Sequence, residues 1–144
     1  MAHQDKGHYA AKHSAETRID EQLADLIRHK AKENVITCAE AISIAETTGK
    51  SIKEVGMNLD LLEMRISACQ MGLFGFTPEK RVVRAARIID PDLRKAIEEK
   101  LQNGKLSCAD SWEIADQRRI SRMTVSETCE ALQIKIKPCQ LGAF

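Results

Sequence analysis

The fold is decided by the stretch IAETTGKSIKEV at residues 44–55, which returns as IADQRRISRMTV at residues 114–125. The two stretches are 70 residues apart, and laying residues 20–74 over residues 90–144 needs no gap. Of the 55 aligned pairs, 16 are identical by direct count. A gapless repeat of this length predicts one small fold that is used twice in the chain.

Composition sets the scale of the fold and excludes few functions. Each copy has about 55 residues, near the lower limit at which a domain folds alone, so we expect the copies to pack on each other or on a second chain. The formal net charge of +1 is unlike that of a strongly basic nucleic-acid binder, although local basic patches matter more than the total. Aromatic residues make up 3% of the chain, which argues against aromatic stacking platforms for single strands.

The sequence carries no sign of a membrane or secretory protein. No apolar run approaches the roughly 20 residues that a helix needs to span a bilayer. The N-terminal stretch MAHQDK lacks the apolar core of a signal peptide. We therefore expect a cytoplasmic protein with no membrane partner, in which the five cysteines are reduced thiols rather than a disulfide framework.

Each copy carries the pattern of three helices. Apolar residues at positions 23, 26, 27 and 31, and at their equivalents 93, 96, 97 and 101, have the spacing of one buried helix face. The second helices are predicted to begin at Thr37 and Ser107, and the third helices at Ser51 and Ser121. The hydroxyl groups of these residues can accept hydrogen bonds from the free backbone N–H groups of a helix start.

Short strands are expected after the helices. Residues 64–67 and 134–137 alternate apolar and polar, the period of a half-buried strand, and Pro138 keeps the second strand at a sheet edge. Residues 77–80 indicate a turn, and the basic run 81–87 is either a second strand, in a hairpin with residues 64–69, or a short helix. The expected organisation is a tail or docking segment (1–17), a first repeat (18–76), a basic linker or wing (77–87) and a second repeat (88–144).

Three helices with a tight turn between the second and third have the layout of a helix-turn-helix. In the first copy Ala45 lets the two helices approach, Gly49 makes the turn and Val55 enters the core. In the second copy Arg119 replaces the glycine, while Ile120 supplies an apolar turn residue. Each copy resembles a winged-helix-like DNA-binding domain. The resemblance implies a mainly α fold of two tandem three-helix helix-turn-helix units, each followed by a short β-strand or rudimentary wing.

In winged-helix-like proteins the third helix enters the major groove, where its early exposed side chains read base edges. The resemblance therefore implies DNA-binding candidates on the third helices and on the basic residues near them. The candidates are Lys53 and Asn58 in the first copy, Arg118, Arg119, Ser121, Arg122, Ser126 and Lys135 in the second, and Arg81 and Arg84 in the linker. The alternative for each arginine or lysine is a solvated surface charge.

The two third helices differ in character. The first carries or precedes three acidic residues, Glu54, Asp60 and Glu63, which would repel phosphate. It also has an apolar patch around Ile52 and Met57 that suits a protein partner or a homodimer. The second is surrounded by basic residues, so we expect the second copy to contribute more to any DNA binding.

Four of the cysteines recur in the repeat. Cys38 and Cys108 fall in the first turn of the second helices, where a helix N-terminus stabilises a thiolate, and Cys69 and Cys139 follow 31 residues later. Each pair could supply two metal ligands or a redox-sensing thiol pair, but a spacing of 31 is not a zinc-site signature. We favour the alternative that these cysteines are small buried residues, and we expect no metal and no cofactor.

The sequence contains no glycine-rich phosphate loop, HExxH motif or nucleophile elbow. We therefore expect a transcriptional regulator, not an enzyme, whose partner is double-stranded DNA. The alternative is a protein–protein interaction or dimerisation module on the same scaffold, with thiol or metal sensing through the repeated cysteines. The CQLGAF ending at residues 139–144 is similar to that of a largely uncharacterised prokaryotic family, and this resemblance implies no mechanism.

Overall fold

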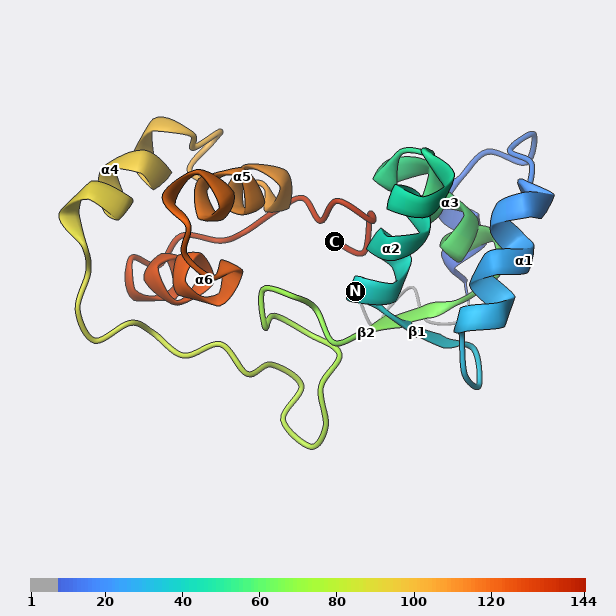
Figure 1. Cartoon of the computed structure of the whole chain (residues 1–144), viewed down its shortest axis with the longest axis horizontal. Coiled ribbons are helices and arrows are strands. Elements are labelled where there is room, and N and C mark those ends of the chain that lie inside the picture. Colours follow the sequence, from blue (N-terminus) through green and yellow to red (C-terminus); the bar gives the residue numbers. More distant parts are fainter. Residues whose placement is uncertain (1–7) are drawn as a thin grey trace. The chain divides into compact units, whose positions relative to one another are not determined.

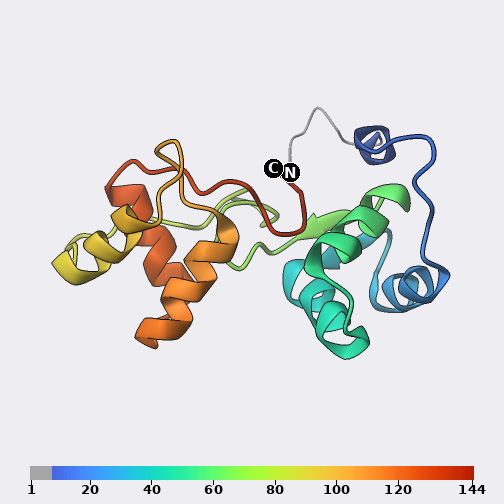
Figure 2. The same ribbon diagram turned by 90° about the horizontal axis from the view of Figure 1, so that it is seen from above.

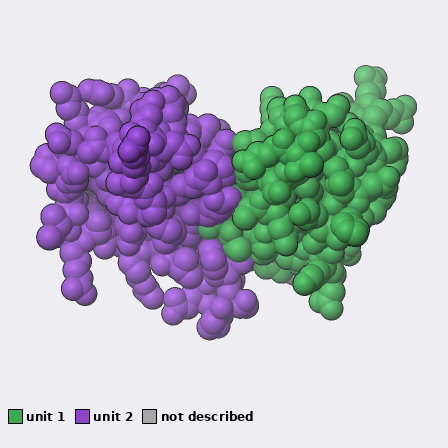
Figure 3. Space-filling model, in the orientation of Figure 1, with its two compact units in different colours: residues 1–69, 141–144 green, residues 70–140 purple. Residues whose placement is uncertain are grey.

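The computed structural model describes residues 8–144 and is mainly α, as the sequence predicted. The chain forms two compact units. Unit 1 contains the residues up to Cys69 together with Leu141–Phe144, and unit 2 contains Gln70–Gln140 (green and purple in Figure 3). Within the described range, every helix is too short or too polar to cross a bilayer.

Unit 1 consists of three helices and a small sheet (Figure 1, and from above in Figure 2). Its elements are the 3-10 turn η2 (Tyr9–Lys12), α1 (Glu21–Lys30), β1 (Val35–Thr37), α2 (Cys38–Thr48), α3 (Ile52–Leu61) and β2 (Arg65–Ser67). The helices pack around five fully buried side chains, which are Leu23, Ile27, Ile44, Val55 and Leu59. Burying one such side chain contributes roughly 1.5–3 kcal/mol, and Leu23, Ile27 and Val55 are positions that the sequence predicted to be buried.

The helix starts of unit 1 confirm the caps predicted at Thr37 and Ser51. The Asp20 carboxylate accepts two backbone N–H groups from the first turn of α1. Thr37 and Glu40 form a reciprocal capping box at α2, and Ser51 caps α3. These bonds satisfy donors that a helix N-terminus leaves without a partner, so they fix the residue at which each helix begins.

The small sheet of unit 1 is parallel and pairs β1 with β2 (Figure 1). Ile36 lies opposite Ile66, and both side chains are buried. The sequence predicted the strand after the third helix but missed β1, whose three residues are too few to show an alternation. The hairpin expected between residues 64–69 and 81–87 is wrong, because β2 pairs with β1 and residues 81–87 form neither a strand nor a helix.

Unit 2 repeats the arrangement with α4 (Pro91–Glu99), α5 (Cys108–Arg118) and α6 (Arg122–Ala131). Leu106 forms a parallel bridge with Ile136, at the positions equivalent to Ile36 and Ile66. This single bridge is shorter than the strand predicted over residues 134–137. Beyond the bridge, the Cys108 N–H donates to the Pro138 carbonyl at 3.0 Å.

The turn between α5 and α6 contains a residue in the left-handed conformation that glycine usually adopts, but the residue is an arginine. Gly49 ends α2 in the left-handed conformation, with φ 73° and ψ 6°. Arg119 occupies the same region after α5, with φ 55° and ψ 43°. A left-handed residue with a side chain costs roughly 1 kcal/mol more than glycine. The substitution noted in the sequence therefore keeps the turn but strains its backbone.

The last residues of each repeat belong to the other unit. The chain leaves unit 1 after Cys69, so residues 70–74 lie in unit 2, and it returns to unit 1 at Leu141, so the endings that follow the two repeated cysteines are exchanged. The expected boundaries, with the repeats ending at residues 76 and 144, therefore differ from the compact units. A repeat identifies equivalent segments, but it does not specify the copy on which each segment packs.

Candidate nucleic-acid interface

Residues 8–13 cover the C-terminal end of α3. Glu63 accepts the backbone N–H groups of Tyr9 at 2.8 Å and Ala10 at 2.7 Å. Asp60 Oδ2 lies 2.8 Å from His13 Nε2. Of the two alternatives for this part of the chain, residues 8–13 form a docking segment. The acidic side chains that would repel phosphate hold this segment in place.

The last residues of the chain cover α3 from a second side. A Cβ built on Gly56 would overlap the Leu141 carbonyl group and lie 2.9 Å from Leu141 Cα. Leu141 and Ala143 are themselves buried. The close approach of this segment therefore requires glycine at position 56. The exposed residues within α3 are Lys53 and Glu54, both in its first turn.

Asn58 was predicted to bind DNA, and the structure contradicts this role. The side chain is only 1% exposed. Its Oδ1 accepts the Asp20 backbone N–H at 2.7 Å, and its Nδ2 donates to the Glu54 carbonyl at 2.9 Å. Asn58 therefore ties α3 to the start of α1, and it cannot also reach a base edge.

In unit 2 the stretch that follows Cys69 runs along α6 (Figure 1). Gly72 packs so closely on α6 that a Cβ built on it would lie 2.8 Å from the Met123 sulfur. Further along, the Ala86 N–H donates to the Glu127 carbonyl at 3.0 Å. The stretch therefore contacts α6 in its first turn and in its middle, while the N-cap residue Ser121 is exposed.

Three of the predicted arginines have carboxylate partners. The pairs are Arg81 with Glu130 at 2.7 Å, Arg84 with Glu79 at 3.2 Å and Arg118 with Asp90 at 3.5 Å. All three arginines are exposed, so each pair contributes little to stability and can exchange its carboxylate for a phosphate. Arg81 also ties the covering stretch to α6, because Glu130 belongs to that helix.

Arg122, the first residue of α6, is held by neutral partners. Its guanidinium lies over the Trp112 ring, with Cζ 3.4 Å from the ring centroid, and its Nη1 donates to Gln70 Oε1. Within the described range it is the one arginine that is not exposed, and it forms no ion pair there. A guanidinium over an indole face is attracted by the ring quadrupole, so this side chain has a defined position.

Two buried polar atoms in unit 2 have no hydrogen-bond partner among the described residues. They are Trp112 Nε1 and Ser126 Oγ. Leaving a buried polar group without a partner costs about 1–3 kcal/mol. Ser126 is 1% exposed, so the DNA contact predicted for it is wrong. Ser126 is equivalent to Gly56, and both positions lie on a third-helix face that another segment covers.

A second group of basic residues lies on the outer side of the Leu106–Ile136 bridge. The Leu106 N–H donates to the Lys135 carbonyl at 3.0 Å, and the Lys137 N–H donates to the Leu106 carbonyl at 2.7 Å. Leu106 and Ile136 are buried, so their alternating neighbours Lys105, Lys135 and Lys137 face outward. We call these three residues the lysine ridge. None of them forms an ion pair with a described residue.

Sequence reasoning found only part of this surface. Lys135 was in the predicted set, whereas Lys105 was missed. The two lysines become neighbours only through the Leu106–Ile136 bridge, which joins segments 30 residues apart in the sequence. Elsewhere in unit 2, the turn before α6 holds exposed Arg119 and exposed Ser121, whose Oγ caps the helix through the Thr124 N–H. The first turn of α6 holds no acidic residue, and its helix dipole adds partial positive charge.

The cysteines lie in packed surroundings. Cys38, Cys69 and Cys108 are buried, and Cys139 is half-buried. Burial raises the pKa of the Cys129 thiol from 9.0 to about 12, which disfavours a reactive thiolate. In the part of the chain that the structure describes, no three His, Cys, Asp or Glu side chains gather as a metal site would require.

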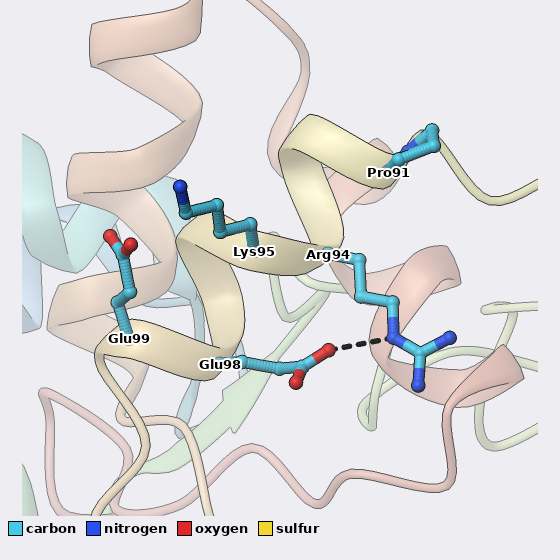
Figure 4. Close-up of a pocket in the computed structure, with 5 residues that line it drawn as sticks. All are labelled: Pro91, Arg94, Lys95, Glu98 and Glu99. Atoms are coloured by element: carbon cyan, nitrogen blue, oxygen red, sulfur yellow. Dashed lines mark hydrogen bonds and ion pairs between the residues drawn. The ribbon is translucent and has the colours of Figure 1, made fainter.

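Figure 4 shows a shallow depression on the exposed side of α4. Its lining residues are Pro91, Arg94, Lys95, Glu98 and Glu99. All come from one helix, and Arg94 Nε lies 2.6 Å from Glu98 Oε1. Charges of both signs that pair along one helix are typical of a solvated face, so this surface is not a candidate site.

Comparison with family models, with curated proteins and with solved structures finds no match to this chain. What the chain does is therefore inferred from its own residues.

Proposed function

We propose that the chain is a transcriptional regulator that binds double-stranded DNA through unit 2. The observation that carries this proposal is the lysine ridge, where three exposed lysines lie close together without carboxylate partners among the described residues. Duplex DNA carries one negative charge per about 1.7 Å of helix axis, so phosphates are a fitting partner for such a patch. The exposed start of α6, with Arg119 and Ser121, belongs to the same helical unit.

Unit 1 supports the proposal less well. The positions equivalent to the lysine ridge are Val35, Arg65 and Ser67, which carry one charge in place of three. Its third helix is covered by residues 8–13 and by Leu141–Phe144. DNA binding is therefore assigned to unit 2, in keeping with the expectation that the second copy contributes more.

Salt dependence gives the proposal a quantitative form. Each phosphate contact contributes about −0.9 to the slope of log Kobs against the logarithm of the salt concentration. Three contacts from the lysine ridge therefore correspond to a slope of about −2.7. Contacts from Arg119 and Ser121 would orient unit 2 on the duplex, and the charge of Arg119 would make the slope slightly steeper.

Fluorescence anisotropy with a labelled duplex, measured over a series of salt concentrations, tests the proposal. The variant Lys105→Ala/Lys135→Ala/Lys137→Ala is expected to lose most of the affinity and to reduce the slope by about 2.7. A matched control is Lys30→Ala/Lys32→Ala/Lys95→Ala, which removes the same charge at three exposed lysines outside the ridge.

Equal losses in the two triple variants would show that net charge alone drives association, and would count against the ridge as a site. The absence of salt-sensitive binding of wild-type protein to any duplex would remove the proposal altogether. Circular dichroism of both variants checks that the helices remain intact.

One observation favours a protein-interaction module as a second function. Both third helices already hold irregular segments of the chain, at Gly56 and at Met123, so these helix faces accept protein ligands. The half-buried Ile52 and Met57 extend the apolar surface of α3. Light scattering on wild type and Met57→Asp tests this function. A dimer that the substitution dissociates supports it, and a monomer in both proteins opposes it.

A further inference from the structure

We infer that Arg122 selects the DNA sequence by reading a guanine, and that Trp112 and Gln70 are the positioning residues that hold it. The inference rests on the proposed DNA binding by unit 2 and names the residue that makes it specific. The lysine ridge contacts phosphates, which carry no sequence information, whereas base edges are read by side chains in the grooves.

The first argument is the place of Arg122 on α6. Ala86 contacts α6 at Glu127, and the C-terminal end of the helix is tied to Arg81 at Glu130. Gly72 packs on Met123 in the first turn, while Ser121, the residue before the helix, is exposed. Recognition helices contact base edges with their N-terminal residues, and Arg122 is the first residue of α6.

The second argument is the way in which the guanidinium is held. Its face lies on the Trp112 ring, and one N–H, at Nη1, donates to the Gln70 amide oxygen. A guanidinium has five N–H donors in a rigid plane. The guanidinium N–H groups that do not bond to Gln70 are held in a fixed orientation. Guanine presents two acceptors in the major groove, O6 and N7, that match a pair of such N–H groups.

The third argument is the charge of the site. Arg122 is half-buried, yet no described carboxylate pairs with it, while exposed Arg81, Arg84 and Arg118 each have one. The positive charge of Arg122 thus remains without a described carboxylate, and the edge of a guanine supplies two acceptors for its N–H groups.

The fourth argument comes from comparing the copies. Trp112 and Arg122 are equivalent to Ile42 and Ile52, so the stacked pair exists in unit 2 alone, whereas Gln70 recurs as Gln140. Ile42 and Ile52 show that the fold needs only an apolar residue at these positions. The stacked arginine is therefore an addition to the fold, and it coincides with the unit that carries the lysine ridge.

Selection from randomised duplexes tests the inference. Wild type is expected to prefer guanine at one position by about 5- to 150-fold, the discrimination of one bidentate contact. Arg122→Lys keeps the charge but loses the fork, so it should keep the salt slope and lose the preference. Arg94→Lys, an equal change on the exposed side of α4, should keep both.

A second measurement needs no change to the protein. Replacing the selected guanine by 7-deazaguanine removes the N7 acceptor, and wild type should then lose most of its preference. Trp112 is the only tryptophan in the chain, so its emission reports on the stacked arginine. The preferred duplex should change this emission more than a duplex without the guanine. Gln70→Ala should reduce the preference without changing the salt slope.

The outcomes separate this inference from the function on which it rests. Salt-dependent binding without a base preference, or a preference that survives Arg122→Lys or 7-deazaguanine, overturns the role of Arg122 and leaves DNA binding by the ridge intact. Failure of every protein to bind any duplex overturns both. A guanine preference that disappears with Arg122→Lys and with 7-deazaguanine supports the inference.

Discussion

Arg119 and Gly49 occupy the same left-handed turn with different side chains. We expect Arg119→Gly to raise the free energy of unfolding of unit 2 by about 1 kcal/mol, because glycine adopts this conformation without the steric cost of a Cβ. Urea denaturation followed by circular dichroism measures the change. The reciprocal control is Gly49→Ala, which meets no atom within 4 Å and should lower the stability of unit 1 by a similar amount.

Cys129 is expected to be the least reactive thiol. Its pKa of about 12 lies above the ordinary value of 9.0, so the folded state holds the proton more tightly than the unfolded state. The resulting stabilisation is complete below pH 9 and is lost as the pH rises from 9 towards 12. Between pH 8 and pH 10.5, wild type should lose about 2 kcal/mol more than Cys129→Ala.

Urea denaturation at the two pH values measures this difference, and timed alkylation with mass spectrometry ranks the thiols. Half-buried Cys139 should react before Cys129. Equal pH dependence in wild type and Cys129→Ala would mean that the thiol ionises normally in the folded state.

At single residues the sequence predicted caps and core well, and exposure poorly. The Thr37 capping box and buried Val55 follow from local spacing, which the structure preserves. The DNA contacts predicted for Asn58 and Ser126 were wrong because segments distant in sequence cover or contact their helices. One signal was available, since Gly56 and Ser126 are small residues at equivalent positions, and small residues on a helix allow close approach.

Among the elements, the helices were predictable because each has a cap and an apolar face of its own. β1 and the Leu106–Ile136 bridge were not, because a parallel pair of such short segments depends on a partner about 30 residues away. The same limit applies to the candidate site. Trp112 and Arg122 were assigned separately, to the core and to DNA, and only the fold brings the ring under the guanidinium.

Two carboxylates, Glu63 and Asp60, hold η2 and the residue after it on α3. Glu63→Gln should weaken the bonds to the Tyr9 and Ala10 N–H groups, because a neutral acceptor binds N–H groups less strongly than a carboxylate. We expect trypsin cleavage after Lys12 to become about fivefold faster, which corresponds to about 1 kcal/mol. Glu54→Gln, on an exposed part of the same helix, is the control. Unchanged cleavage in Glu63→Gln would mean that other contacts hold the segment.

At the scale of the whole molecule, the exchanged endings make each unit depend on a segment that is remote in sequence. Removing Leu141–Phe144 should destabilise unit 1 by about 2–3 kcal/mol, mostly through loss of the buried Leu141 side chain. Unit 2 retains all of its own residues.

Hydrogen exchange with mass spectrometry resolves the two units. Amides of α1, α2 and α3 should exchange faster in the shortened chain, and those of α4, α5 and α6 should not change. Equal acceleration in both sets would mean that the units unfold together.

The exchange also has a consequence for the order of synthesis. Ribosomes add about 5–20 residues per second, so the 71 residues of Gln70–Gln140 delay the arrival of Leu141 by roughly 4–14 s. During that interval Gly56 faces an empty position on α3, and the first matching segment to emerge is Gln70-Met71-Gly72, the equivalent of Gln140-Leu141-Gly142. A nascent chain can therefore close unit 1 with the wrong ending, and reaching the final fold then requires this early pairing to be released.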